Sequence, residues 1–236
     1  MIRFVWVSLV LVAATAGYGL IAIGASLLGR RGDIYFWCTQ QWARAVVRAS
    51  GSPVITSGME RIDWSKPHVL VANHMAGYDI VALASVLPVP FYFVGKKELN
   101  RIPLFGTAWR AAGHISIDRS NRSTAIASMR SAGERIRREN GIVIVFPEGT
   151  RSKSGTLQPF KKGAFVMAAD SGIPIAPAVI AGSDRVQPRG TYRIEPRPVE
   201  IRFLETVDAS AYTGRIDALM ETVRERMMES VREATA

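Results

Sequence analysis

The sequence predicts an α/β fold, with a mostly parallel central sheet flanked by helices and preceded by an N-terminal hydrophobic helical segment that anchors the chain to a membrane. Short runs of β-branched and other apolar residues alternate with helix-like stretches, a pattern typical of a largely parallel sheet. No charged residue occurs from Phe4 to Gly29, and a helix of that length can cross a hydrocarbon core of about 30 Å. The 236 residues suit one domain with such an appendage.

The uncharged run is followed by a second helical stretch, Asp33 to Ser50, which mixes aromatic residues with arginines. That mixture suits the lipid headgroup layer, so residues 1–50 are predicted to form a membrane anchor that either spans the bilayer or enters one leaflet. The competing interpretation makes residues 4–29 a buried core helix. After Gly51 the composition changes to globular alternation, which predicts a separate domain over residues 51–236. Four basic residues behind the uncharged run predict that this domain lies on the cytoplasmic side of an inner or plasma membrane: Arg30, Arg31, Arg44 and Arg48.

Strands and helices are expected in alternation beyond the anchor. Strands are predicted at the short apolar, β-branched runs, which occupy residues 68–72, 91–95, 115–117, 142–146, 175–181 and 199–204. Helices are predicted over the intervening stretches at residues 77–87, 123–140, 162–170 and 216–233. Pro88 ends the first of these helices, and Asn140 with Gly141 closes the second.

The charge balance limits the partners. With 30 Lys and Arg against 20 Asp and Glu, the formal charge of +10 favours polyanions: nucleic acid, an anionic membrane surface or a phosphorylated substrate. Nucleic acid is not expected, because the aromatic residues cluster in the anchor instead of alternating with the basic stretch. Cys38 is the lone cysteine, and no Cys/His cluster has the spacing of a zinc site, so we expect neither a metal nor a cofactor.

A first candidate site is the segment Asn73 to Asp79, where a predicted buried strand gives way to a helix. Ligands collect at the carboxyl ends of strands in such sheets. His74 is suited to take a proton from a hydroxyl nucleophile, and Asp79 on the first helical turn could hold its ring in one tautomer. The alternative is a hydrogen-bonded pair with a purely structural role.

A second candidate site is the segment Phe146 to Ser152, which follows another buried run. Pro147 stops the strand and Gly149 permits a tight turn, which brings Glu148 and Arg151 into one short loop. A guanidinium there can fork onto a phosphate. The alternative is an ordinary turn carrying an exposed ion pair.

The order of five segments, NHxxxxD, KxEL, G-x4-D-R, FPEGTRS and IPIAPAVI, resembles the glycerolipid acyltransferase family, over about His68 to Ile180. The resemblance implies that His74 is the catalytic base and Asp79 its partner. It further implies binding of the substrate by a set of polar residues: Lys96, Asp118, Arg119, Glu148, Gly149 and Arg151. Residues 51–236 then form the catalytic domain, and residues 1–50 the anchor.

The resemblance also implies an activity. The expected reaction moves an acyl group from acyl-CoA or acyl-carrier protein to the sn-2 hydroxyl of 1-acyl-sn-glycerol-3-phosphate (lysophosphatidic acid), giving phosphatidic acid for phospholipid biosynthesis. Transfer is expected to be direct, since the chain has no G-x-S-x-G segment and Cys38 lies in the anchor. Two alternatives stay open: a different acceptor, such as glycerol-3-phosphate, another lysophospholipid or a lyso-ornithine lipid, and a catalytically silent lipid-binding protein.

Overall fold

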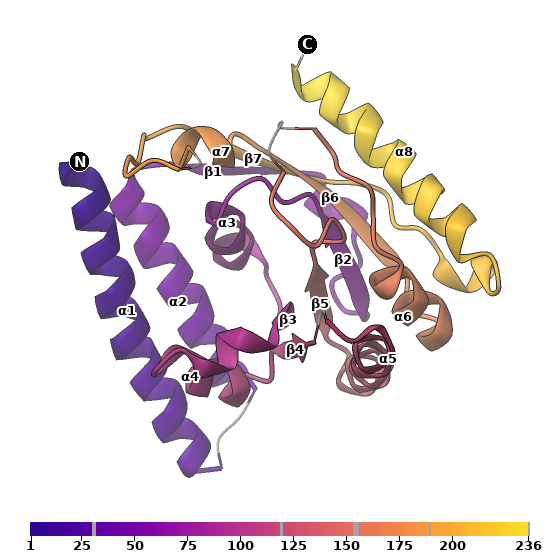
Figure 1. Ribbon diagram of the computed structural model, residues 1–236, viewed down its shortest axis with the longest axis horizontal. Helices are drawn as coiled ribbons and strands as arrows, with labels where there is room; N and C mark the ends of the chain where they lie inside the picture. The colour runs from indigo at the N-terminus through magenta and orange to yellow at the C-terminus, as the bar shows by residue number, and fades with distance from the viewer. Residues whose placement is uncertain (30–31, 119, 153–155, 189, 236) are drawn as a thin grey trace.

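The computed structural model describes residues 1–29, 32–118, 120–152, 156–188 and 190–235, and these form a seven-stranded sheet with helices on both faces (Figure 1). The strand order is β1-β7-β6-β2-β5-β3-β4. The strands are β1 (Val54–Ser57), β2 (His68–Ala72), β3 (Phe91–Lys96), β4 (Ile115–Ile117), β5 (Ile142–Val145), β6 (Ile175–Ala181) and β7 (Val199–Phe203).

The sheet is mostly parallel, as predicted. Neighbouring strands from β6 through β2, β5 and β3 to β4 all pair in parallel, whereas β7 pairs antiparallel with β6 and parallel with β1. The carboxyl ends of five strands therefore meet at one edge. β2, β5 and β6 are buried along nearly their whole length, which explains their nearly unbroken apolar sequences.

The helices divide between the two faces of the sheet. They are α1 (Ile2–Leu27), α2 (Asp33–Ser50), α3 (Tyr78–Val86), α4 (Phe105–Ala111), α5 (Arg122–Glu139), α6 (Gly163–Ser171), α7 (Ser183–Val186) and α8 (Ile216–Thr235). Three short 3-10 helices complete the set: η1 (Met59–Arg61), η2 (Lys97–Arg101) and η3 (Ala209–Tyr212). One core packs α2, α3 and α4 against the sheet, and a second packs α5, α6 and α8 against the other face.

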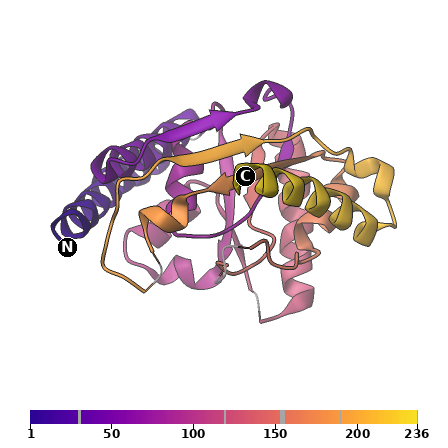
Figure 2. The same ribbon diagram turned by 90° about the horizontal axis from the view of Figure 1, so that it is seen from above.

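The two N-terminal helices lie side by side along one flank of the molecule (Figures 1 and 2). α1 is long and apolar enough to cross a membrane, with a mean hydropathy of 2.0, and 11% of the residues in its most apolar window are buried. That exposure favours membrane association over the core-helix alternative. α2 differs, because Ala43 and Val46 are buried in the same core as α3. The boundary near residue 50 stays a prediction, and it coincides with the left-handed Gly51 that ends α2.

The predicted strands and helices are all present, with ends shifted by one or two residues at most positions. The strand β1, the helices α4 and α7 and the three short 3-10 helices were not predicted. β1 is a four-residue edge strand, α4 begins after an unusual turn at Leu104, and α7 is a single turn of helix. Elements this short carry too few residues to establish a period of 2.0 or 3.6.

Candidate active site

The carboxyl edge of the sheet brings the predicted residues together. Val71 of β2 pairs with Val145 of β5. His74 and Glu148 each follow three residues later, so both lie just beyond the carboxyl edge, on neighbouring strands. On the other side of β5, β3 ends at Lys96, which pairs with Ile117 of β4. Parallel pairing thus gathers segments that lie far apart in the sequence.

His74 and Asp79 form a close pair. The His74 Nδ1 lies 2.7 Å from Asp79 Oδ2, and the Asp79 side chain is fully buried. Because the carboxylate can only accept, Nδ1 carries the proton and Nε2 keeps a free lone pair. The same Asp79 oxygen accepts the backbone N–H groups of Met75 (2.7 Å) and Ala76 (2.9 Å), which fixes the carboxylate in the turn before α3. The arrangement is that of a histidine base oriented by an aspartate.

Two neighbours to which the sequence interpretation gave no role of their own hold this turn in place. The Phe146 ring stacks on the His74 imidazole, with centroids 4.2 Å apart and planes inclined by 19°. The Asn73 side chain donates to the Ile180 carbonyl at 2.8 Å and accepts the Ile180 N–H at 2.7 Å. Asn73 therefore ties the His74 turn to β6. Its place directly before His74 was the only sequence signal for this role.

Each oxygen of the Glu148 carboxylate accepts a backbone N–H group. Oε1 accepts the N–H of His74 at 2.7 Å, and Oε2 accepts the N–H of Gln158 at 3.0 Å. Burial raises the pKa of this carboxyl, and the two N–H donors oppose that shift. The His74 carbonyl in turn accepts the N–H of Ser152 at 2.8 Å. Glu148 and its loop therefore position the backbone of His74.

One basic side chain lies over this loop and a second belongs to it. Gly149 has a φ of +71°, and a β-carbon there would lie 2.8 Å from Lys161 Nζ. The Lys161 N–H donates to the Pro147 carbonyl at 2.8 Å, so Lys161 is held over the turn. Arg151 Nη1 lies 3.9 Å from the position of a β-carbon on Gly77, beside the first turn of α3. Lys161 was missed from sequence, because nothing local marks it among the many basic residues.

The remaining predicted residues lie toward β4. Lys97 Nζ bonds Asp118 Oδ2 at 2.5 Å, and this bond with those from Ser120 lowers the pKa of Asp118 to about 2. The ion pair thus uses Lys97, the neighbour of the predicted Lys96. Lys96 itself is exposed at the end of β3. Arg119 lies outside the described residues.

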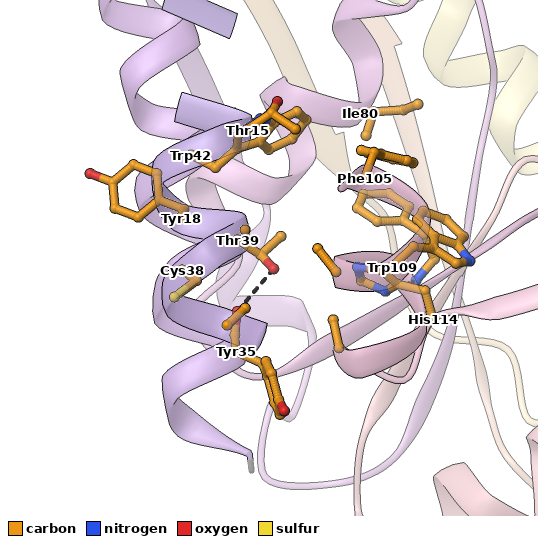
Figure 3. Close-up of a pocket in the computed structure, with 15 residues that line it drawn as sticks. Thr15, Tyr18, Tyr35, Cys38, Thr39, Trp42, Ile80, Phe105, Trp109 and His114 are labelled. Carbon is orange, nitrogen blue, oxygen red and sulfur yellow. Dashed lines mark hydrogen bonds between the residues drawn. The ribbon is translucent and has the colours of Figure 1, made fainter. Parts of the chain in front are cut away.

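An apolar pocket lies between α1, α2, α4 and the sheet. Thr39 of α2 lies on one side of it, and Phe105 and Trp109 of α4 lie on the other (Figure 3). Ile80, the residue after Asp79, is part of its wall, as is His114. Burial lowers the pKa of His114 to about 3, and the nearby Arg135 adds to the shift, so this wall is uncharged near neutral pH.

The fold and the site define an α/β protein with a His–Asp pair at the carboxyl edge of a mostly parallel sheet. No group of three His, Cys, Asp or Glu side chains that could hold a metal occurs among the described residues. The sequence profile described as Acyltransferase matches residues 53–181. The chain belongs to this acyltransferase family, which confirms the family expected from the sequence.

Individual relatives carry a more specific name. A 1-acyl-sn-glycerol-3-phosphate acyltransferase of Limnanthes douglasii is 34% identical over 181 residues, which cover 76% of this chain and 64% of that protein. The protein of the same name from Saccharomyces cerevisiae is 33% identical, and the match covers 96% of this chain and 77% of that protein. This chain thus spans somewhat under two thirds of the plant relative.

The fold is similar to a solved structure along its whole length. The crystal structure of the 1-acyl-sn-glycerophosphate (LPA) acyltransferase from Thermotoga maritima superposes with a TM-score of 0.86 at 25% sequence identity. The match covers 100% of this chain and 95% of that one, so it includes both N-terminal helices.

Proposed function

We propose that this protein transfers an acyl group from acyl-CoA or acyl-carrier protein to the sn-2 hydroxyl of 1-acyl-sn-glycerol-3-phosphate, giving phosphatidic acid. The observation that carries the proposal is the His74–Asp79 pair, whose Nδ1 and Oδ2 atoms lie 2.7 Å apart. This pair is hydrogen-bonded to the Glu148 loop, which carries Arg151 and is covered by Lys161. The names of the plant and yeast relatives support this acceptor. Lysophosphatidic acid brings one hydroxyl and one phosphate, which match one base and nearby cations.

The chemistry follows from the free lone pair on His74 Nε2. This nitrogen takes the proton of the acceptor hydroxyl as its oxygen attacks the thioester carbonyl. The tetrahedral intermediate collapses, the carbon–sulfur bond breaks, and the imidazolium returns the proton to the leaving thiolate. Asp79 stabilises the imidazolium between these steps. Removing a general base slows such a reaction typically about 10²–10⁴-fold.

The phosphate is assigned to the cations at the loop. Arg151 supplies a planar fork that matches two phosphate oxygens, and Lys161 supplies a point charge over Gly149. Lys96, which the family resemblance implied, is a further candidate at the end of β3. Glu148 supports this site indirectly, because its two oxygens already accept backbone N–H groups.

The acyl chain and the membrane are assigned to the N-terminal half. The pocket between α1, α2 and α4 presents an apolar wall that includes Ile80, directly after Asp79, so it can hold hydrocarbon close to the base. We propose that residues 1–50 anchor the protein, with the site facing an anionic membrane surface on the cytoplasmic side. The exposed apolar surface of α1 supports this anchoring.

The test is a product assay with the purified full-length chain. Lysophosphatidic acid, glycerol-3-phosphate, another lysophospholipid and a lyso-ornithine lipid are each supplied with acyl-CoA or acyl-carrier-protein donors, and products are identified by mass spectrometry. We expect phosphatidic acid with wild type and a severe loss with His74→Ala. A preference for another acceptor would replace the proposed substrate. Lipid binding without any acylated product would identify a silent lipid-binding protein.

A further inference from the structure

The turn before α4 has an unusual backbone at Leu104. Its φ is 59° and its ψ is −54°, and the Phe105 N–H donates to the Pro103 carbonyl at 2.6 Å. This is a three-residue γ-turn with a positive central φ, a rare and strained form. A branched side chain such as leucine makes this conformation still less favourable, whereas glycine adopts positive φ freely.

The side chains of this turn are exposed as well as apolar. Leu104 is 42% exposed and Ile102 is 47% exposed, and the whole stretch Arg101–Leu104 is on the surface. In water, the strained backbone and the exposed leucine both cost free energy, and asparagine at position 104 would remove the cost of the exposed apolar side chain. A strained residue that the surrounding structure holds in place indicates a role beyond folding.

The turn is held rigidly, so these side chains are presented outward. The Gly106 N–H donates to the Ile102 carbonyl at 2.7 Å, and Arg110 Nη1 donates to the Asn100 carbonyl at 2.9 Å. A β-carbon on Gly106 would collide with the backbone of Asn100, which shows how closely η2 and α4 pack. These contacts fix the backbone of the turn, so the Leu104 side chain cannot fold back onto the protein surface.

The turn adjoins the apolar flank of the molecule. α4 packs on α1 (Figure 1). The contact is close, because a β-carbon added to Gly19 of α1 would lie 3.7 Å from the β-carbon of Ala108 in α4. The neighbouring Leu20 and Ile21 on α1 are exposed. Ile102 and Leu104 thus extend the apolar surface of α1 onto the catalytic domain.

The charge around the turn fits an anionic surface. Arg101 and Arg110 are both exposed, and neither is within ion-pair distance of an acid in the described part of the chain. Apolar side chains surrounded by arginines suit the boundary between anionic headgroups and acyl chains.

We propose that the turn formed by Ile102, Pro103 and Leu104 is a second membrane contact, which inserts into an anionic lipid bilayer beside α1. η2 directly follows the carboxyl end of β3, so this contact brings the edge of the sheet that carries His74 against the lipid surface. The active site then opens where a lipid acceptor resides. α1 concentrates the protein on the membrane, and the turn sets its orientation.

A depth measurement tests the contact directly. The variant Ile102→Cys is labelled with bimane, and the native Cys38 is buried and therefore unreactive. Full-length protein is bound to vesicles of phosphatidylcholine and phosphatidylglycerol that carry a nitroxide on the acyl chain. The matched control is Ile55→Cys on the edge strand β1, where Ile55 is 52% exposed. We expect the nitroxide lipid to quench the label at 102 and aqueous iodide to quench the label at 55. Quenching of the label at 102 by iodide alone would overturn the proposal.

A second variant separates lipid contact from folding. Leu104→Asn should lower the lipid partition coefficient about tenfold, as expected for removing one half-exposed leucine from an apolar phase, while the thermal midpoint stays unchanged. Ile55→Thr should change neither quantity. A lower thermal midpoint with unchanged partitioning would mean that Leu104 serves the fold. A shift from dimer to monomer in lipid-free sedimentation, with unchanged partitioning, would mean that the turn contacts a second copy.

Discussion

Replacing Glu148 by glutamine tests whether this residue positions His74, the proposed base, or binds the acceptor. The carboxylate accepts one N–H from His74 and one from Gln158, at 2.7 and 3.0 Å. An amide has one accepting oxygen and one donating NH2 group, so in either orientation one backbone N–H loses its acceptor and faces another donor. The volume of the side chain hardly changes, and the defect is therefore electrostatic.

The magnitude follows from two opposing terms. A hydrogen bond to a charged group contributes about 1.5–3 kcal/mol, and one such bond is lost. The raised pKa of Glu148 shows that burial disfavours its charge, so removing that charge offsets part of the loss. We expect a net destabilisation of about 1–2 kcal/mol, which lowers the thermal midpoint by roughly 2–8 °C in a chain of this size. A base displaced by a fraction of an ångström should reduce kcat about tenfold to a hundredfold.

The assay separates kcat from the acceptor KM. With Glu148→Gln we expect a reduced kcat and an acceptor KM within about threefold of wild type, because an interaction that acts through His74 contributes mainly in the transition state. The control is Glu205→Gln, since the Glu205 side chain is 69% exposed and its removal should alter neither stability nor rate. An unchanged kcat with a strongly raised acceptor KM would refute the reasoning and place Glu148 against the substrate.

Four further substitutions test the rest of the site. His74→Ala should reduce turnover about 10²–10⁴-fold, and Asp79→Asn should reduce it severely with the fold intact by circular dichroism; near-normal rates in either folded variant would contradict the base mechanism. Arg151→Lys should raise the acceptor KM, because a point charge replaces a bidentate fork, and an unchanged KM would place the phosphate elsewhere. Gly149→Ala should raise the acceptor KM by displacing the lysine above it, whereas Gly172→Ala, with a similar positive φ and open space around it, should cost only stability, about 1 kcal/mol in each case. Equal kinetics in the two glycine variants would remove the lysine from the acceptor site.

Much of the fold could be predicted from the sequence, because the signals for its strands and helices are local. β2, β5 and β6 are buried on both sides, so each appears in the sequence as a short apolar run, and left-handed residues such as Asn140 and Gly172 end their helices visibly. β1 and α4 were not predicted, since an edge strand and a seven-residue helix draw their stability from tertiary packing.

The sequence by itself determined the α/β class, the apolar first helix and the His74–Asp79 pair, because each depends on residues within a few positions of one another. Only the tertiary structure decided that β5 lies between β2 and β3, and this order brings Glu148 under the backbone of His74. It also decided that Lys161 lies over Gly149 and that Lys97 forms the ion pair with Asp118. The physical reason is that hydrophobic periodicity fixes which face of a strand is buried but carries no information about which strand becomes its neighbour.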